Sequence, residues 1–149
     1  MRKAWRIVKE KHAATAFNGE GARIFGGRWN SAGTSVVYCS GTKSLAALES
    51  LVHLNPYVSF KYVAIPIEFD ESLVEKFTGL PADWTGEPPS PSTKSIGDDW
   101  VKESRSAVLE LPSVTISGEA NYLLNPAHPR FKKIVIGKPE PFSFDSRLL

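Results

Sequence analysis

The sequence predicts an α+β fold, a single domain with a mixed or antiparallel β core and a few helices. Three observations lead to this expectation. Short apolar stretches with strand-like alternation recur along the chain, whereas the segment 42–54 has a clear helical period. Turn residues separate these stretches throughout, with 11 glycines and 11 prolines. A length of 149 residues fits one domain, and we therefore expect 1–149 to form one folding unit.

The composition is that of an ordinary globular protein, with 42% hydrophobic and 23% charged residues. A net charge of +2 without a block of lysine and arginine gives no case for direct nucleic-acid binding. Cys39 is the only cysteine, so no intrachain disulfide can form and a reducing compartment is expected. The start, Met-Arg-Lys-Ala-Trp, does not resemble a signal peptide. No apolar run approaches the roughly 20 residues of a membrane span. We expect a cytoplasmic protein without a membrane partner.

The first half of the chain reads as strand, loop, strand and helix. A short strand is expected at 5–8, followed by a long structured loop at 12–34 that carries five glycines. Ser35–Ser40 reads as a buried strand, and Thr42 is suited to cap the helix 42–54. Asn55-Pro56 should end this helix, because a residue before proline is disfavoured in the α region.

The second half is mostly strands. The segment 61–69 alternates cleanly, and Pro66 predicts that its strand lies at an edge or is bulged. Residues 71–77 suggest a helical turn, 78–99 a proline-rich surface excursion, and 98–104 a short helix. Further strands are expected at 106–111, about 121–124, 133–136 and near 142–144.

Glu49 interrupts the apolar face of the helix 42–54. It lies four residues after Leu45 and three before Val52, and helical geometry places it in the same stripe. A carboxylate there requires a cationic partner, hydrogen-bond donors or an open cleft. A half-exposed structural carboxylate is the alternative.

A second group of candidates lies upstream. Arg28 follows two glycines, and its guanidinium is suited to a phosphate or carboxylate, although a salt bridge to Glu49 without ligand is the alternative. Arg23 is a second choice in the same loop, and Arg6 is a further candidate phosphate partner. Tyr38 offers a ring that can stack on a heterocycle, or it is simply a core tyrosine. We expect arginine, tyrosine and glutamate to converge on one site.

Other reactive side chains are less promising. His53 lies four residues after Glu49, but one such pair is weak evidence, and no metal site is expected. Cys39 should point to the face opposite Tyr38 and be a buried apolar residue rather than a nucleophile. Ser113 ends a strand, where serine is usually a turn residue, and no Gly-x-Ser-x-Gly motif surrounds it.

The ordered set of motifs resembles the RES domain family across nearly the whole chain. The family is named for an arginine, a glutamate and a serine, which fall here on Arg28, Glu49 and Ser113. The matching segments are Gly27-Arg28-Trp29-Asn30, Tyr38, Leu45-Ala46-Ala47-Leu48-Glu49 with His53, Leu111-Pro112-Ser113, Glu119-Ala120-Asn121-Tyr122-Leu123-Leu124-Asn125-Pro126-x-His128-Pro129, and Phe144-Asp145-x-Arg147-Leu148.

The resemblance implies an ADP-ribosyltransferase-like fold and a toxin of a bacterial type II toxin–antitoxin pair. Its partner would be an Xre-like helix-turn-helix antitoxin, through which alone it would meet nucleic acid; a homodimer is left open. Such toxins consume NAD+ as substrate, by hydrolysis or with inorganic phosphate as co-substrate, and need no further cofactor. Some instead ADP-ribosylate a protein, and a non-catalytic binding relative is a further alternative.

The resemblance also implies roles for the candidate residues. Arg28, Tyr38, Glu49 and Ser113 would be catalytic, with Glu49 stabilising the positive charge that develops on the ribose. Arg28, Tyr38, Arg6 and Asn125 would contact NAD+.

Overall fold

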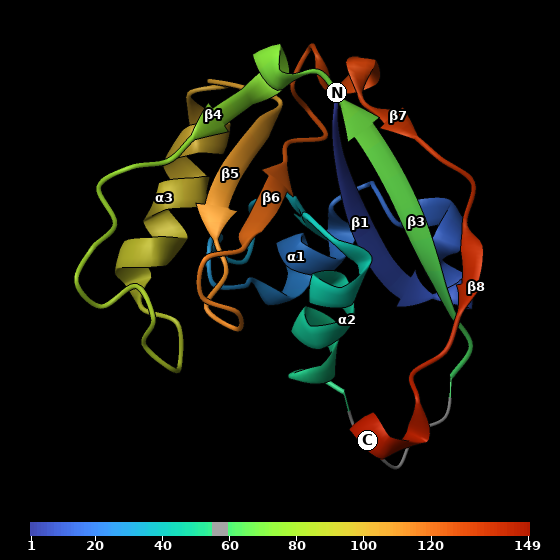
Figure 1. The fold of residues 1–149 in the computed structure, drawn as a ribbon. Helices are drawn as coiled ribbons and strands as arrows, with labels where there is room; N and C mark the ends of the chain where they lie inside the picture. The colour runs from blue at the N-terminus through green and yellow to red at the C-terminus, as the bar shows by residue number, and fades with distance from the viewer. Residues whose placement is uncertain (55–59) are drawn as a thin grey trace.

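The computed structural model describes residues 1–54 and 60–149, which form one curled β sheet with three α-helices packed against it (Figure 1). The strands of this part of the chain are β1 Arg2–Lys9, β2 Val37–Ser40, β3 Tyr62–Phe69, β4 Val74–Lys76, β5 Val108–Pro112, β6 Ala120–Leu124, β7 Val135–Ile136 and β8 Glu140–Phe142. The α-helices are α1 Glu20–Phe25, α2 Lys43–Leu51 and α3 Pro91–Lys102. Four short 3₁₀ turns complete the set: η1 Glu10–Thr15, η2 Glu71–Leu73, η3 Phe131–Lys133 and η4 Ser146–Leu148.

The sheet runs in the order β4-β5-β6-β2-β1-β3-β7, and β8 also pairs with β3. Its strand pairs are antiparallel except β4 with β5, which are parallel. The expected α+β class with a mixed sheet is confirmed. In Figure 1, β4–β6 with α3 form one side of the molecule and β1, β3 and β7 the other, with α1 and α2 between them.

Each face of the sheet has its own apolar core, because successive strand residues point to opposite faces. On one face, Val37, Cys39 and Leu124 join a core that includes Ile67 and Phe69. On the other face, the side chains that alternate with these pack against α3. This second core is built from Trp29, Val36, Trp100, Leu109, Leu111 and Leu123.

The strand β3 follows its predicted pattern, with Val63, Ile65, Ile67 and Phe69 all buried. The expected edge position or bulge at Pro66 is wrong, because β3 pairs with β1 in one unbroken register along its whole length and has neighbours on its other side as well. Those neighbours are short: β8 pairs with 62–64 and β7 with 67–68. Pro66 therefore lies opposite the gap between β7 and β8, where a missing N–H donor is tolerated.

The helix α2 begins as predicted, since the Thr42 hydroxyl accepts a hydrogen bond from the Leu45 N–H at 3.0 Å. It ends at Leu51, earlier than expected, and the proposed stop at Asn55-Pro56 lies outside the described residues. Leu45 is buried, but Val52 is 61% exposed and does not belong to the apolar stripe.

Two segments contain more regular structure than the sequence predicted. The expected loop 12–34 holds most of η1 and all of α1. The expected excursion 78–99 is irregular only as far as residue 90, because α3 begins at Pro91, seven residues before the predicted helix. The turn expected at 71–77 is η2 followed by the strand β4. Within the described residues, no helix is long and apolar enough to cross a membrane.

Candidate functional site

Glu49 lies on α2 and points at the ends of β5 and β6, where two uncharged donors hold it. The Ser113 hydroxyl donates to Glu49 Oε1 at 2.6 Å, and the Asn121 side-chain amide donates to the same oxygen at 3.2 Å. Ser113 is 2% exposed, whereas Glu49 is only partly buried. The requirement for a partner is therefore met by hydrogen-bond donors, and the glutamate and serine expected in the site are in direct contact.

Both donors are themselves held by a further hydrogen bond. Asn121 Oδ1 accepts from the Ser40 hydroxyl at 2.7 Å, and Ser113 Oγ accepts from the Ile116 N–H at 3.0 Å. Ser40 and Asn121 are direct neighbours in the register of β2 with β6. The carboxylate is thus attached to a network anchored in the sheet.

Tyr38 lies two residues before Ser40 on β2 and on the same face. Its hydroxyl donates to Asn30 Oδ1 at 2.6 Å and accepts from the Trp29 N–H at 3.1 Å. A Cβ at Gly27 would lie 2.6 Å from this hydroxyl, so only glycine allows the loop to approach so closely. Burial raises the pKa of the Tyr38 phenol above its ordinary value, which keeps it protonated. Tyr38 therefore anchors the loop that carries Arg28.

Arg28 is held by the irregular segment before α3. Its guanidinium donates to the main-chain carbonyls of Trp84 at 3.0 Å and Gly86 at 2.8 Å, and pairs with the Glu87 carboxylate at 2.7 Å. The Arg28 side chain is 15% exposed and that of Glu87 is 75% exposed. The salt bridge to Glu49, considered from the sequence, is replaced by this one.

One face of α3 holds the main chain on both sides of Arg28. Lys94 Nζ donates to the Gly27 carbonyl at 2.7 Å, and Asp98 Oδ1 accepts from the Ser31 N–H at 2.9 Å. Between them in the helix lies Gly97, where a Cβ would fall 1.8 Å from the Trp29 carbonyl oxygen. Residues 94, 97 and 98 share one helix face. The helix α3 therefore contacts the loop 26–36 that carries Arg28, called the arginine loop below, directly.

The arginine loop and Glu49 lie on the same face of the sheet. Alternate strand residues project from one face roughly 7 Å apart. Tyr38, which contacts the arginine loop, is therefore a neighbour of Ser40 along β2, and Ser40 contacts Asn121 beside Glu49. The structure therefore places the loop that carries Arg28 on the same face of the sheet as Tyr38, Glu49 and Ser113.

Three other candidates have contacts outside this network. Arg6 is on the opposite face, where it donates to the main-chain carbonyls of Ala16 at 2.7 Å and Tyr38 at 2.9 Å, and burial lowers its pKa. Asn125 is 2% exposed and its Oδ1 accepts from the Ala127 N–H at 3.0 Å, which stabilises a turn. Arg23 pairs with Glu20 on the exposed surface of α1. The structure does not bring Arg6 or Arg23 to Glu49.

The two residues set aside as reactive groups lie as follows. Cys39 is buried on the face opposite Tyr38, as predicted, and burial raises the pKa of its thiol to about 12. A thiol in this state is a poor nucleophile at neutral pH. His53 is exposed beyond the end of α2.

Sequence reasoning missed Ser40 and Glu87, and it named Asn30 and Asn121 within motifs without giving them a role. Asn121 lies in a segment noted for its polar side chains, and Ser40 shares the strand and face of Tyr38. Alternation along β2 was therefore the one sequence signal that could have linked Ser40 to the site. Glu87 carried no signal, because its contact with Arg28 joins segments 59 residues apart.

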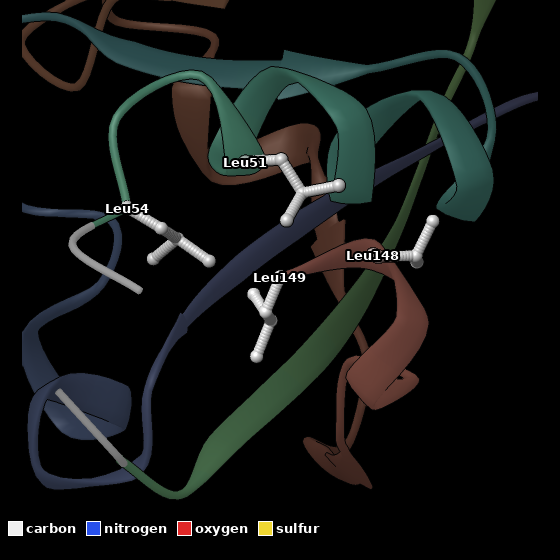
Figure 2. A pocket seen from close by; sticks show the side chains of 4 residues that line it. All are labelled: Leu51, Leu54, Leu148 and Leu149. Atoms are coloured by element: carbon white, nitrogen blue, oxygen red, sulfur yellow. The ribbon is translucent and has the colours of Figure 1, made fainter. Parts of the chain in front are cut away.

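Two surface hollows lie away from this network. One, of about 210 Å³, is lined by Leu51, Leu54, Leu148 and Leu149, between the end of α2 and the end of the chain (Figure 2). The other, of about 430 Å³, is lined by Phe17, Ile65 and Ile136 among others. Neither is lined by Glu49 or Arg28.

The curled mixed sheet, the oriented carboxylate and the supported arginine define a small α+β protein with an enzyme-like polar site. The RES domain model matches residues 3–145. The chain belongs to the RES domain family.

Relatives and a solved structure agree with this assignment. The chain is 35% identical to the Prs ADP-ribosylating toxin of Sphingobium sp. (strain YBL2), covering 97% of this chain and 95% of the relative. It is 34% identical to Toxin Res of Yersinia enterocolitica, with 97% of each covered, and 35% identical to Toxin Res of Photorhabdus laumondii, with 97% and 96% covered. The toxin–antitoxin complex MbcT-MbcA of M. tuberculosis contains a similar fold, with a TM-score of 0.77 at 16% identity over 95% of this chain and 84% of that one. The protein is a toxin of the RES family.

Proposed function

We propose that this toxin cleaves the nicotinamide–ribose bond of NAD+ in the bacterial cytoplasm. The observation that carries the proposal is the Glu49 carboxylate, which is partly exposed and held by Ser113 and Asn121, with no cationic partner within residues 1–54 and 60–149. Neutral donors orient a carboxylate without placing a positive charge beside it that would offset its field. The negative charge of the carboxylate is what the reaction requires.

The chemistry follows from the way the bond breaks. As nicotinamide departs, positive charge develops on the ribose, as it does in glycoside hydrolysis. Glu49 would stabilise this charge where it forms, with its geometry fixed before the reaction begins. Nicotinamide is a good leaving group, so no activated nucleophile on the protein is needed.

Arg28 and Tyr38 would serve binding. The guanidinium presents paired N–H donors from which pyrophosphate oxygens can accept hydrogen bonds. In this structure one of its nitrogens, Nη2, donates to the Glu87 carboxylate. Tyr38 would hold the arginine loop and could present its ring to the nicotinamide. Asn125 stays a proposed NAD+ contact, whereas Arg6 has no support from its position.

The acceptor of the ADP-ribosyl group distinguishes two versions of the proposal. Water or phosphate would give simple consumption of NAD+. Transfer to a protein is the second candidate, and the relative named as a Prs ADP-ribosylating toxin, 35% identical over almost the whole chain, supports it.

We further propose an antitoxin partner that covers the Glu49 face. The curated relatives are named as toxins, and a protein of similar fold was solved as a toxin–antitoxin complex. An antitoxin of the Xre-like helix-turn-helix class is the specific expectation. Light scattering of the toxin alone and with this partner would give the stoichiometry and would reveal a homodimer.

The test is the variant Glu49→Gln, assayed by nicotinamide release from NAD+ with water, phosphate and protein acceptors. Loss of one preorganised charge-stabilising group should lower kcat by roughly 100-fold or more. The melting temperature should change little, because glutamine keeps the size of the side chain and an acceptor for Ser113.

Glu68→Gln is the matched control. Glu68 lies on β3, and its only cationic partner among the described residues is Lys3 at 3.5 Å on the exposed surface. This variant should keep wild-type turnover. Wild-type protein that releases no nicotinamide with any acceptor would end the proposal, and labelled ADP-ribose retained on protein would select transferase over hydrolase.

A further inference from the structure

We propose that Ser40 and Asn121 are positioning residues that fix the Glu49 carboxylate, so that one oxygen is bound by the protein and the other faces the substrate. This inference rests on the proposed NAD+ cleavage. It assigns a function to two residues outside the arginine, glutamate and serine for which the family is named.

The first step is the asymmetry of the carboxylate. Ser113 Oγ and Asn121 Nδ2 both donate to Oε1, at 2.6 Å and 3.2 Å. Across residues 1–54 and 60–149, no donor contacts Oε2. One oxygen is therefore held, and the other is the one available to a ribose hydroxyl or to developing positive charge.

The second step is the direction of the Asn121 amide. A carboxylate can only accept hydrogen bonds, so the amide must present its nitrogen to Glu49. Its oxygen must then face Ser40, whose hydroxyl donates to it at 2.7 Å. Ser40 thereby stabilises the one amide orientation that serves Glu49, and the flipped orientation would place two acceptors against each other.

The third step is the direction of the Ser113 hydroxyl. Its oxygen accepts from the Ile116 N–H at 3.0 Å, which leaves its single proton for Glu49. In each of the two donors to Oε1, the oxygen atom thus accepts a hydrogen bond from a second partner, Ser40 for Asn121 and Ile116 for Ser113. Neither can turn away from the carboxylate without losing a second hydrogen bond.

The fourth step is rigidity. Ser40 is 4% exposed on β2 and is paired with Asn121 in the β2–β6 register. The orientation of the carboxylate is therefore set by two hydrogen-bonded strands rather than by the freedom of a side chain on α2. Groups held in this way hold reacting geometry more accurately than groups on loops.

The test measures kcat and KM for nicotinamide release by Ser40→Ala and Asn121→Asp. Loss of a charge-assisted hydrogen bond, or of its orientation, should lower kcat about 10-fold or more for Asn121→Asp and less for Ser40→Ala. KM should change less than threefold, because neither residue contacts NAD+ in this scheme. Ser40→Thr keeps the hydroxyl on a strand and should restore turnover.

The pH profile of Asn121→Asp separates positioning from a structural role. A protonated aspartic acid can donate to Glu49, whereas an ionised one repels it. Its kcat deficit should therefore shrink as the pH falls toward the aspartate pKa, relative to wild type at the same pH. Ser50→Ala is the matched control, since this α2 hydroxyl donates to the Ala46 carbonyl at 2.8 Å, within its own helix.

Crystal structures of wild type and Ser40→Ala provide a readout that does not depend on activity. The proposal expects the Glu49–Asn121 contact in wild type and its lengthening or loss in the variant. Normal kcat at every pH in Ser40→Ala and Asn121→Asp, with active wild type, would overturn the positioning role and leave the proposed function standing. If wild type is inactive on NAD+ but the contact is lost in Ser40→Ala, the proposed function fails while the positioning of Glu49 stands.

Discussion

At the scale of single residues, the site separates negative from positive charge. Glu49 is held by a hydroxyl and an amide, and Arg28 by two carbonyls and Glu87. An arginine in contact with Glu49 would cancel the field that a developing ribose cation needs. Uncharged donors hold the carboxylate without that loss, which is a physical reason for the two charges to have different partners.

Glu87→Gln tests whether the Glu87 carboxylate stands where an anionic part of the substrate binds. Its side chain is 75% exposed, and the pair with Arg28 must open before a phosphate can take the same donors. Removing the charge should lower KM for NAD+ about two- to fivefold, within the range of an exposed ion pair, and leave kcat unchanged. Steady-state kinetics at low salt measure this effect.

Glu103→Gln serves as the comparison for that variant. Glu103 also forms an exposed ion pair with an arginine, Arg105, at 2.6 Å, and within the described part of the chain its carboxylate has no hydrogen bond to Arg28 or Glu49. Its KM should equal that of wild type. A KM that rises in Glu87→Gln would mean that Glu87 supports Arg28 rather than competing for it.

At the scale of elements, α3 is the support of the arginine loop. Lys94 and Asp98 bind the main chain before and after Arg28, and Gly97 lies against the Trp29 carbonyl. The segment from the end of β4 to α3 adds the carbonyls that hold the guanidinium. The segment 78–99, which the sequence predicts to be a surface excursion, therefore supplies the partners that hold Arg28 and its loop.

Gly97→Ala should displace this loop. The new Cβ would fall 1.8 Å from the Trp29 carbonyl oxygen, so the helix or the loop must move. Overpacking of this kind costs about 1–3 kcal/mol of unfolding free energy, and KM for NAD+ should rise with the displacement of Arg28. Urea denaturation and steady-state kinetics measure the two effects.

Gly21→Ala is the control for that substitution. Gly21 lies within α1, and a Cβ there would meet nothing within 4 Å. The change should be neutral or stabilise the protein by up to about 1 kcal/mol. Equal stability of the two variants would contradict the close packing of α3 against the loop.

Local patterns predicted the elements that carry a cap or a clear period in their own sequence. Thr42 and Leu45 define the start of α2, and the alternation of Val63 to Phe69 defines β3. The sequence predicts the start of α3 seven residues too late, because Ser90-Pro91, a suitable helix start, lies within a proline-rich stretch, and Ser92 and Gly97 have low helix propensity. Contacts of the buried Thr93, Gly97 and Trp100 with the rest of the fold stabilise the helix instead. The strand β4 has three residues and pairs in parallel with the distant β5, so no local signal reveals it.

The same distinction applies to the site. Glu49 is visible in the sequence because it breaks a helical period, and Arg28 because it follows two glycines. The roles of Ser40 and Asn121 depend on the register of β2 with β6, which joins residues 81 apart. Such a register cannot be read from spacing along the chain.

At the scale of the whole molecule, the sheet separates a core without candidate catalytic groups from the face that carries them. Ile67, Phe69 and Leu124 lie in the core of one face, and Tyr38 packs with the core of the other. Stability and activity should therefore respond to different sets of substitutions.

Ile67→Ala tests this separation. Ile67 is fully buried, so its truncation should lower the free energy of unfolding by about 2–5 kcal/mol. The protein that remains folded at 25 °C should keep the KM of wild type. Val135→Ala, at a position 57% exposed, should leave the free energy of unfolding and the KM equal to those of wild type within error. A changed KM in Ile67→Ala would mean that the two faces are coupled.

The Arg28 guanidinium is bound by two main-chain carbonyls rather than by side chains, and this affects which substitutions the site tolerates. Every amino acid offers the same oxygen at positions 84 and 86, whatever its side chain, provided that the chain follows the same path. Substitutions at positions 84 and 86 can therefore accumulate without loss of the hydrogen bonds to Arg28. Homologues can differ in sequence there and still form the same two hydrogen bonds to the arginine. The path of the main chain, rather than residue identity, is therefore the feature to compare among them.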